Sequence, residues 1–290
     1  MSTLVGRASE LARIRACLKA GRNLLLEGPV GVGKTHLALA ASRELKTPVF
    51  RVDGDNRYSE QKLSGWFDPP LVVKKGFGKD TFVAGPLVEA MRKGGLLFIN
   101  ELNRLPEGVQ NVLLPAIDER LIVVPRLGEV KAAAGFLVIA TQNPKEFVAT
   151  SHLSEAILDR FELVVLDYQS EEEELAIVSG RVGKSKNQAA ALLPLAAVRL
   201  ARLTRGHPRV RRGASIRAAL SVTDIALVLL QGGATLEDAF VSAAIMALPT
   251  RIEIERDADS GASARDELER LVADWAKTVL AELKDGKKKS

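Results

Sequence analysis

The sequence has a single cysteine, only three histidines and no long uninterrupted hydrophobic stretch. The lone Cys17 excludes an intrachain disulfide and a zinc site built from cysteines. His36, His152 and His207 lie far apart along the chain, so a histidine-built metal site is not expected. No apolar run is long enough to span a membrane, and the N-terminal residues lack the apolar core of a secretory signal. The sequence therefore predicts a cytoplasmic protein without a membrane partner.

Aromatic residues are also scarce, at 4% of the 290 residues, whereas 47% are hydrophobic and 27% are charged. This composition supports a sizeable core and excludes wholesale disorder, and the length predicts one large domain or two smaller ones. The net charge is +5, but residues 175–223 contain ten Lys or Arg and no Asp or Glu, which leaves −5 for the rest. We expect such a segment to attract nucleotide phosphates, nucleic acid or an acidic protein surface.

Short apolar runs alternate with amphipathic helical patterns in the first half of the chain. Continuous apolar runs are typical of strands in a sheet that is covered on both faces. Strands are expected at residues 23–27, 49–52, 96–100, 136–141 and 163–166. Helices are expected between them at residues 34–45, 87–93 and 109–120. This alternation predicts an α/β fold with a mostly parallel five-stranded sheet.

The second half of the chain reads as helical, and no strand is expected after Asp167. Ser170 and Glu173 have the spacing of a capping box, and Thr235 with Asp238 marks a second helix start. Helices are expected at residues 188–203, 213–230, 236–248 and 264–283. The predicted organisation is an α/β core in residues 1–168, a helical domain in 169–254, and a C-terminal helix with a basic tail in 255–290. Within the core, residues 55–83 read as an irregular insertion and residues 120–135 as a β-hairpin.

Residues 28–35, GPVGVGKT, match the phosphate-binding pattern G-x-x-x-x-G-K-[ST] at every position. Glycines let backbone N–H groups turn toward phosphate oxygens, and the helix that starts here adds its positive N-terminal end. Lys34 can reach the terminal phosphates, and Thr35 offers a hydroxyl to magnesium. The strand before the loop and the helix after it are the setting that such a site needs. The predicted nucleotide-binding residues are Gly28, Pro29, Val30, Gly31, Val32, Gly33, Lys34, Thr35 and His36.

The strand at residues 96–100 ends in Asn100 and Glu101, where a phosphate loop needs an acidic partner. Glu101 is the candidate general base that orients the attacking water. Asn100 stands where a magnesium-assisting carboxylate is expected, and its amide keeps a carbonyl acceptor without the negative charge. Because Asn100 would act through Thr35 or a water, we expect magnesium binding weakened by about 10- to 100-fold rather than abolished hydrolysis. The alternative is that Asn100 and Glu101 only cap the strand.

The order of these motifs resembles the AAA+ ATPases and, within them, the MoxR group. The resemblance covers residues 5–254. Its more specific segments are NELNR at 100–104, TQNP at 141–144, LDRF at 158–161 and GASIR at 213–217. The chain departs from the family pattern at Asn100, where Asp is usual, and at Ile216, where Pro is more usual. The resemblance implies a P-loop NTPase fold with a three-layer αβα core, a parallel five-stranded sheet and a C-terminal all-α lid.

The resemblance assigns catalytic roles to Asn143, Arg160 and Arg217, of which the first two lie in the α/β core. Asn143 would be the first sensor, which holds water or the γ-phosphate from the tip of its strand, and the alternative is a simple turn. Arg160 would be the arginine finger that reaches the nucleotide of a neighbouring subunit. The alternative for Arg160 is a surface ion pair with a nearby acid such as Asp159 or Glu162.

The resemblance also implies roles for residues near the two ends of the match. Arg217 would be the second sensor, which brings the lid to the phosphates, or one more arginine of the basic segment. Val5, Gly6 and Arg7 resemble the stretch that lines the adenine pocket, and Val5 and Gly6 would contact the nucleotide there. Arg104 would act near a subunit boundary or only at the start of a surface helix. The insertion and the hairpin would be levers that move with the nucleotide state, or passive surface loops.

The function implied by the resemblance is an ATP-driven remodelling motor that uses ATP and Mg²⁺. It would assemble as a homo-oligomeric, hexameric ring, because an arginine finger supplied in trans makes one subunit an incomplete enzyme. MoxR-like ATPases commonly act with separate proteins that carry a von Willebrand factor A domain. Two alternatives remain open. One is a motor that acts on nucleic acid, which the basic segment favours and the scarcity of aromatic residues disfavours. The other is a nucleotide-binding switch with weak hydrolysis because of Asn100.

Overall fold

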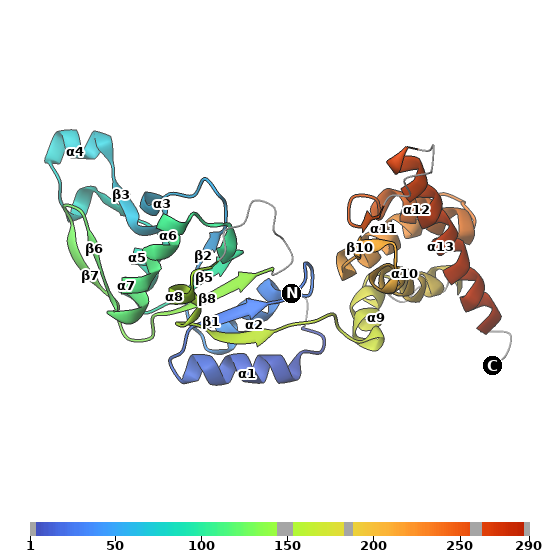
Figure 1. Cartoon of the computed structure of the whole chain (residues 1–290), viewed down its shortest axis with the longest axis horizontal. Helices are drawn as coiled ribbons and strands as arrows, with labels where there is room; N and C mark the ends of the chain where they lie inside the picture. The colour runs from blue at the N-terminus through green and yellow to red at the C-terminus, as the bar shows by residue number, and fades with distance from the viewer. Residues whose placement is uncertain (1–3, 144–152, 183–187, 256–262, 287–290) are drawn as a thin grey trace. The chain divides into compact units, whose positions relative to one another are not determined.

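The computed structural model describes residues 4–143, 153–182, 188–255 and 263–286. The chain divides into two compact units, residues 1–167 and residues 168–290 (Figure 1). None of the helices in the described ranges is long and apolar enough to cross a bilayer. Parts of the segments discussed above lie outside the described ranges: Pro144 of TQNP, His152, the basic-segment residues Lys184 and Lys186, and the tail residues 287–290.

A parallel sheet of five strands forms the centre of the first unit. Its strand order is β2 (Val49–Asp53), β5 (Leu96–Asn100), β8 (Leu137–Gln142), β1 (Leu24–Glu27) and β9 (Glu162–Val165). Every neighbouring pair in this order is parallel. The predicted α/β fold is therefore confirmed, and each strand begins and ends within one residue of its expected position.

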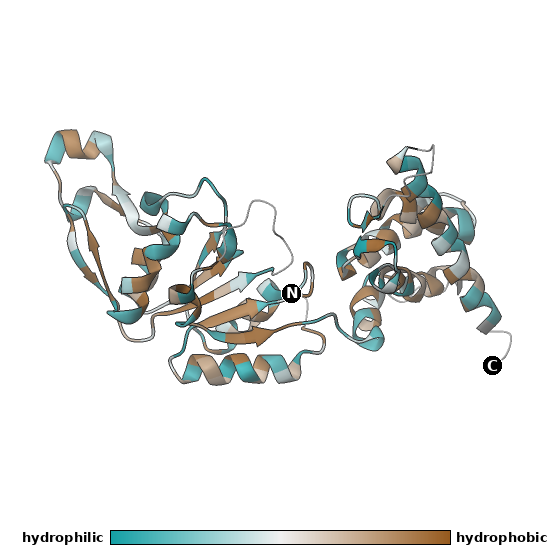
Figure 2. Cartoon of the chain, viewed as in Figure 1, coloured by the Kyte–Doolittle hydropathy of each residue, from teal (hydrophilic) through white to brown (hydrophobic). Residues whose placement is uncertain are grey.

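Both faces of this sheet are covered, which explains why its strands are continuously apolar. Because side chains alternate along a strand, Leu25 and Leu97 contribute to one hydrophobic cluster, which also contains Leu87 and Met91 of α5 (Pro86–Lys93). Buried side chains of the opposite parity face α1 (Ala8–Lys19) and α2 (Lys34–Glu44), which contact β1 and the strands β5, β8 and β9. Figure 2 shows the strands as mainly hydrophobic and α1 as mixed.

The insertion at residues 55–83 is more regular than expected. It contains α3 (Glu60–Ser64), β3 (Gly65–Phe67), α4 (Pro69–Lys75), the short 3₁₀ helix η1 (Lys79–Thr81) and β4 (Phe82–Ala84). The expectation of an irregular segment was therefore wrong. Proline suits the first turn of a helix, where its missing N–H is not needed, and the Asp68 side chain caps α4 by accepting from the Leu71 N–H at 3.0 Å.

The hairpin at residues 120–135 consists of the antiparallel strands β6 (Leu121–Val124) and β7 (Gly128–Lys131). The guanidinium of Arg126, in the turn between these strands, lies 4.1 Å from the centre of the Phe77 ring. The hairpin therefore contacts the other insertion through a cation–π pair.

One expected helix, at residues 109–120, is divided into α6 (Glu107–Asn111) and α7 (Leu113–Asp118). Pro115 has no N–H to donate to the Asn111 carbonyl, and its ring crowds that carbonyl. The helical pattern is therefore broken where the two short helices meet. The 3₁₀ helix η2 (Leu102–Arg104) precedes α6, and α8 (Glu155–Leu158) precedes β9.

The second unit is built from α9 (Glu171–Ser179), α10 (Gln188–Gly206), α11 (Ile216–Gln231), α12 (Leu236–Ala247) and α13 (Ala264–Gly286). Its core consists largely of buried alanine and leucine, and α13 contributes Trp275 to it. The predicted capping box is confirmed, because the Ser170 hydroxyl accepts from the Glu173 N–H at 3.2 Å. One expectation was wrong: two short antiparallel strands, β10 (Val210–Arg212) and β11 (Glu253–Ile254), follow Asp167.

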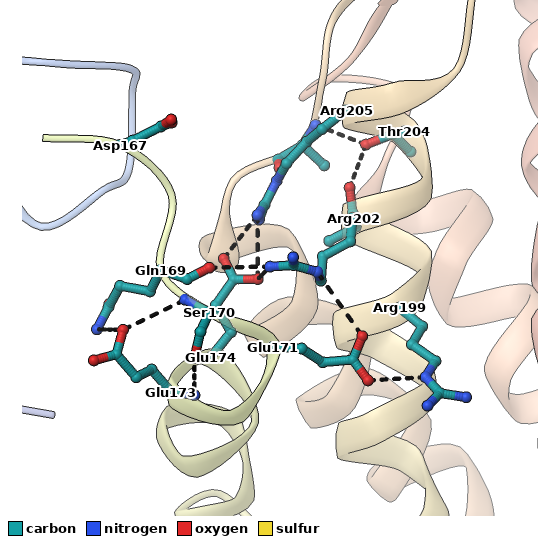
Figure 3. Close-up of polar contacts among 12 residues, drawn as sticks. Asp167, Gln169, Ser170, Glu171, Glu173, Glu174, Arg199, Arg202, Thr204 and Arg205 are labelled. Atoms are coloured by element: carbon teal, nitrogen blue, oxygen red, sulfur yellow. Dashed lines mark hydrogen bonds and ion pairs between the residues drawn. The ribbon is translucent and has the colours of Figure 1, made fainter. Parts of the chain in front are cut away.

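Five arginines of the basic segment pair with carboxylates of the same unit, and Figure 3 shows three of them, Arg199, Arg202 and Arg205. The pairs are Arg199–Glu171 at 3.0 Å, Arg202–Glu174 at 3.2 Å, Arg205–Glu174 at 2.8 Å, Arg211–Glu255 at 3.2 Å, and Arg209–Glu267. Glu174 is buried, and Arg205 also stacks over the Tyr168 ring at 3.8 Å. Four acids that flank the basic segment in the sequence therefore pair with half of its ten basic residues, and these five arginines have partners within the unit.

We predict that Glu174→Ala destabilises the second unit far more than Glu171→Ala does. The first change removes the acceptor that Arg202 and Arg205 share at a buried position, and breaking such a pair costs about 3 kcal/mol or more. The second removes a half-exposed partner, which is worth less than about 1 kcal/mol. Urea unfolding followed by Trp275 fluorescence in a Trp66→Phe background reports on this unit alone. Equal losses for the two variants would contradict the prediction.

Candidate nucleotide-binding site

The phosphate loop connects β1 to α2 and turns through conformations that glycine adopts easily. Gly28, Gly31 and Gly33 have φ values of 155°, 81° and 93°. Gly33 immediately precedes α2, so the loop ends at the N-terminus of an eleven-residue helix. Backbone N–H groups at such an end, together with the helix dipole, attract anions. His36 lies in the first turn of α2 with an exposed side chain.

The first residue of the loop is packed against the backbone that leaves β9. The Leu166 N–H donates to the Glu27 carbonyl at 2.7 Å, which extends the β1–β9 pairing by one residue. A Cβ atom on Gly28 would lie 2.2 Å from the Leu166 carbonyl oxygen. Glycine is therefore required at position 28 for packing against Leu166. This reason is separate from the one that the sequence predicted, which was the close approach of phosphates to the loop backbone.

Lys34 extends back across the loop from the first turn of α2. Its ammonium donates to the carbonyl oxygens of Gly28 at 2.7 Å and Pro29 at 2.9 Å. Both carbonyls belong to the loop itself, so the side chain holds its positive charge against the phosphate loop. This arrangement suits a polyphosphate, because an ammonium forms stronger hydrogen bonds with charged oxygens than with neutral carbonyls.

Polar side chains from α2, β5 and β8 meet at the carboxyl end of the sheet. Asn100 Oδ1 accepts from Thr35 Oγ1 at 3.3 Å and from Thr141 Oγ1 at 3.2 Å. The Thr141 hydroxyl also accepts from the Glu101 N–H at 2.9 Å. Side-chain alternation places Asn100 on the same face as Phe98, the face that α2 covers. The structure therefore brings together the three predicted residues Thr35, Asn100 and Glu101.

Thr141 is a member of this network to which the sequence analysis gave no role. Its sequence signals are its place in the TQNP segment and near the end of the apolar strand, two residues before Asn143. Threonine is common in strands, so this signal is weak. Oxygen atoms of Thr35 and Asn100 are the type of ligand that Mg²⁺ prefers, which makes the pair compatible with a magnesium ion. No group of three or more His, Cys, Asp or Glu that could hold a metal occurs in the described ranges.

Glu101 has an unusual backbone conformation, with φ 58° and ψ 59° in the left-handed region. Such a conformation costs energy in a non-glycine residue and persists only when its surroundings fix it. The Gly54 N–H donates to the Asn100 carbonyl at 2.7 Å, and a Cβ on Gly54 would lie 2.1 Å from the Glu101 carbonyl oxygen. The Glu101 carboxylate accepts from Arg104 at 2.8 Å, so Arg104 contacts the candidate base within the same chain.

Asn143 and Arg160 each lie just beyond the end of an element, β8 and α8 respectively. Asn143 directly follows β8 and is buried. Arg160 follows α8 and forms an ion pair with Asp118 at 2.7 Å. An ion pair was the alternative to the finger role, but its partner is neither Asp159 nor Glu162. Asp118 is 42 residues away in the sequence, so no local pattern identifies it.

The remaining predicted residues lie at the start of the first unit and in the second unit. Val5 is partly buried and Gly6 is exposed, and both precede α1. Arg217 lies in the first turn of α11 with an exposed side chain. Gly213 and Ala214, which precede it, are held against α10, because the Ala214 N–H donates to Thr204 Oγ1 at 2.9 Å.

Comparisons with known proteins agree with this geometry. The model of the AAA domain (dynein-related subfamily) matches residues 23–161. An uncharacterized protein of Staphylococcus epidermidis is 30% identical over 217 residues, which cover 74% of this chain and 82% of that protein. The chain belongs to the AAA+ ATPase family.

Two solved structures share the fold at low sequence identity. NtrX from Brucella abortus, in complex with ADP, has a TM-score of 0.59 at 17% identity and covers 96% of this chain and 64% of that chain. A RuvB mutant from Thermotoga maritima has a TM-score of 0.52 at 19% identity and covers 84% of this chain and 71% of that chain. Family membership implies a nucleotide-binding site, which is the role that the phosphate loop suits.

We predict that Gly54→Ala destabilises the protein, whereas Gly78→Ala does not. A methyl group at Gly54 would overlap the Glu101 carbonyl, and relieving such overpacking costs about 1–3 kcal/mol. A methyl group at Gly78 meets nothing within 4 Å and requires no unusual backbone conformation. Thermal unfolding of both variants measures the difference. A Gly54→Ala protein as stable as the parent would contradict the close packing of Gly54 on Glu101.

Proposed function

We propose that this protein is a MoxR-type AAA+ ATPase, which hydrolyses ATP in a ring of identical subunits and remodels a separate partner protein. The observation that carries the proposal is the convergence of Thr35, Asn100 and Glu101 beside the phosphate loop. Asn100 and Glu101 stand at the carboxyl end of β5 and Thr35 in the first turn of α2, at the edge of the sheet where ligands bind in open α/β folds. The segments NELNR, TQNP, LDRF and GASIR support the MoxR assignment.

In this proposal each group of the site has one task. The loop N–H groups and the Lys34 ammonium bind the phosphates of ATP. The Glu101 carboxylate orients the attacking water and accepts its proton, and Asn143 assists at the tip of β8. Thr35 and Asn100 would hold magnesium, which when bound neutralises charge on the phosphates. The ion pair with Arg104 restrains the Glu101 carboxylate before ATP and water are in place.

The ring follows from the role proposed for Arg160. An arginine finger acts on the nucleotide of the next subunit, so each active site needs two chains. The ion pair between Arg160 and Asp118 holds the guanidinium until a neighbouring subunit offers phosphate oxygens in exchange. A protein partner, such as one with a von Willebrand factor A domain, is favoured over nucleic acid because carboxylates of the same unit already bind half of the basic segment.

We predict that Glu101→Gln and Arg160→Ala each bind ATP but hydrolyse it at least about 10³-fold more slowly, and that an equimolar mixture regains activity. In a mixed ring, an Arg160→Ala subunit keeps Glu101 and receives Arg160 from a Glu101→Gln neighbour. Phosphate release and calorimetry measure turnover and binding. Arg22→Ala, which changes an exposed arginine near β9, is the matched control and stays fully active.

Each alternative predicts a different outcome of this experiment. A nucleotide switch would show ATP binding without turnover even in the parent. Two inactive variants that stay inactive when mixed would exclude a finger in trans, and a fully active Arg160→Ala protein would exclude any finger role. Steeply salt-dependent DNA binding by the parent would favour a nucleic-acid motor.

We predict that Asn100→Asp lowers the magnesium concentration needed for half-maximal ATP binding and turnover by about 10- to 100-fold. An aspartate keeps an oxygen that accepts from Thr35 and Thr141 and adds the missing negative charge. Magnesium titrations with a fluorescent ATP derivative report binding independently of hydrolysis. Lower ATPase activity of the variant at limiting magnesium would contradict the explanation.

A further inference from the structure

Arg7 is a buried arginine whose side chain joins three segments of the first unit that lie far apart in the sequence. Its side chain is only 8% exposed, although it precedes a surface helix as the N-cap of α1. Its backbone has φ 63° and ψ 22°, in the left-handed region that non-glycine residues seldom occupy. A buried charge held in a costly conformation needs a compensating set of contacts.

Those contacts reach the phosphate loop and the end of the unit. One terminal nitrogen of the guanidinium donates to the Glu10 carboxylate at 2.7 Å. The other donates to the Val32 carbonyl at 3.3 Å and to the Asp167 carbonyl. Val32 lies in the middle of the phosphate loop, and Asp167 is the last residue of the first unit. A single side chain therefore links the loop to the backbone that follows β9.

The contact with Val32 has a consequence for the loop N–H groups. In a trans peptide the carbonyl and the following N–H point in opposite directions, so fixing the Val32 carbonyl also fixes the Gly33 N–H. Gly33 has φ 93°, and a Cβ built there would meet nothing within 4 Å. The Gly33 side of this peptide therefore has no side-chain contact that restrains it, whereas the Val32 side chain on the other side is buried. The hydrogen bond from Arg7 adds a direct restraint on the Val32 carbonyl.

We infer that Arg7 is a positioning residue of the nucleotide site, which holds the Val32–Gly33 peptide so that the Gly33 N–H faces the bound phosphates. Through the same guanidinium, the state of the phosphate loop is transmitted to Asp167. This inference rests on the proposed function, because it assigns the Gly33 N–H to a phosphate. The inference adds Arg7 to the residues of the proposed nucleotide site. Arg7 lies outside the phosphate loop, and its other contact, Asp167, is 160 residues away in the sequence.

Arginine suits this role better than lysine. The planar guanidinium presents several N–H donors in a fixed geometry, so it can serve a carboxylate and two carbonyls at once. Glu10 balances the charge. Burial alone would raise the pKa of the Glu10 carboxyl, but hydrogen bonds from Arg7 and Ser9 outweigh burial and lower the pKa below its ordinary value. The Glu10 carboxylate therefore stays ionised at neutral pH.

The test compares Arg7→Met and Arg7→Lys with Arg15→Met in the full chain. Arg15 is the matched control, because it lies on α1 and pairs with Glu44 without contacting the loop. Losing one charge-assisted N–H contact predicts ADP binding about 10- to 100-fold weaker in both Arg7 variants and unchanged in Arg15→Met. Isothermal titration with ADP and magnesium measures the affinities. Arg7→Lys keeps the positive charge, so its ADP affinity tests the role of Arg7 even if Arg7→Met does not fold.

Hydrogen exchange supplies a readout that a merely structural role would not change. In the parent, we expect ADP to protect amides in residues 28–36 and also in residues 163–169. In the Arg7 variants at saturating ADP, protection at 163–169 is lost, whereas Arg15→Met keeps both. A folded Arg7→Lys protein that binds ADP as tightly as the parent, or that keeps protection at 163–169, would overturn the inference.

The design separates this inference from the proposed function. If the parent neither binds nor hydrolyses ATP, the proposed function itself fails. If the parent binds and hydrolyses ATP and Lys34→Ala does not bind it, the site is correct, and normal ADP affinity in Arg7→Lys then refutes only the role of Arg7.

Discussion

The position of β1 between β8 and β9 is the constraint on which the rest of the site depends. Because all three strands are parallel, their carboxyl ends meet at one edge, and the phosphate loop has a neighbour on each side. On one side Leu166 fills the space beside Gly28, and on the other the β8 hydroxyl of Thr141 reaches Asn100 and Glu101. A one-residue slip of either pairing would send these side chains to the opposite face of the sheet.

The sequence predicted the features that depend on local pattern. Five apolar runs, a glycine-rich loop and Ser170 as a helix cap each depend on a few consecutive residues, and the structure has them where expected. Glu101 and Asn100 were also predictable, because the end of a buried parallel strand is placed by the sheet itself. The irregular reading of residues 55–83 failed because Pro69, Pro70 and the nearby glycines are equally compatible with short helices and turns.

Contacts between distant segments could not be predicted, because nothing in a local pattern pairs them. Arg160 pairs with Asp118 rather than with an adjacent acid, and Arg209 pairs with Glu267, 58 residues away. The ten uncompensated charges of residues 175–223 therefore indicated an external polyanion, whereas half of them have partners within the folded unit. The net charge of a segment shows that its basic side chains need acidic partners, but it does not show whether those partners lie elsewhere in the same folded unit or in another molecule.

At Asn100, the hydrogen bonds that hold the fold together do not depend on the charge that the proposed chemistry would use. Its amide oxygen accepts from two hydroxyls, and a carboxylate oxygen would accept the same two bonds. The network of Thr35, Thr141 and Glu101 therefore does not require an amide at this position, and the fold is indifferent to the choice between Asn and Asp. What Asn100 changes is the charge beside the phosphates. If the proposed function holds, this residue, which the fold does not select, is the one expected to set how strongly ATP binding and turnover depend on magnesium.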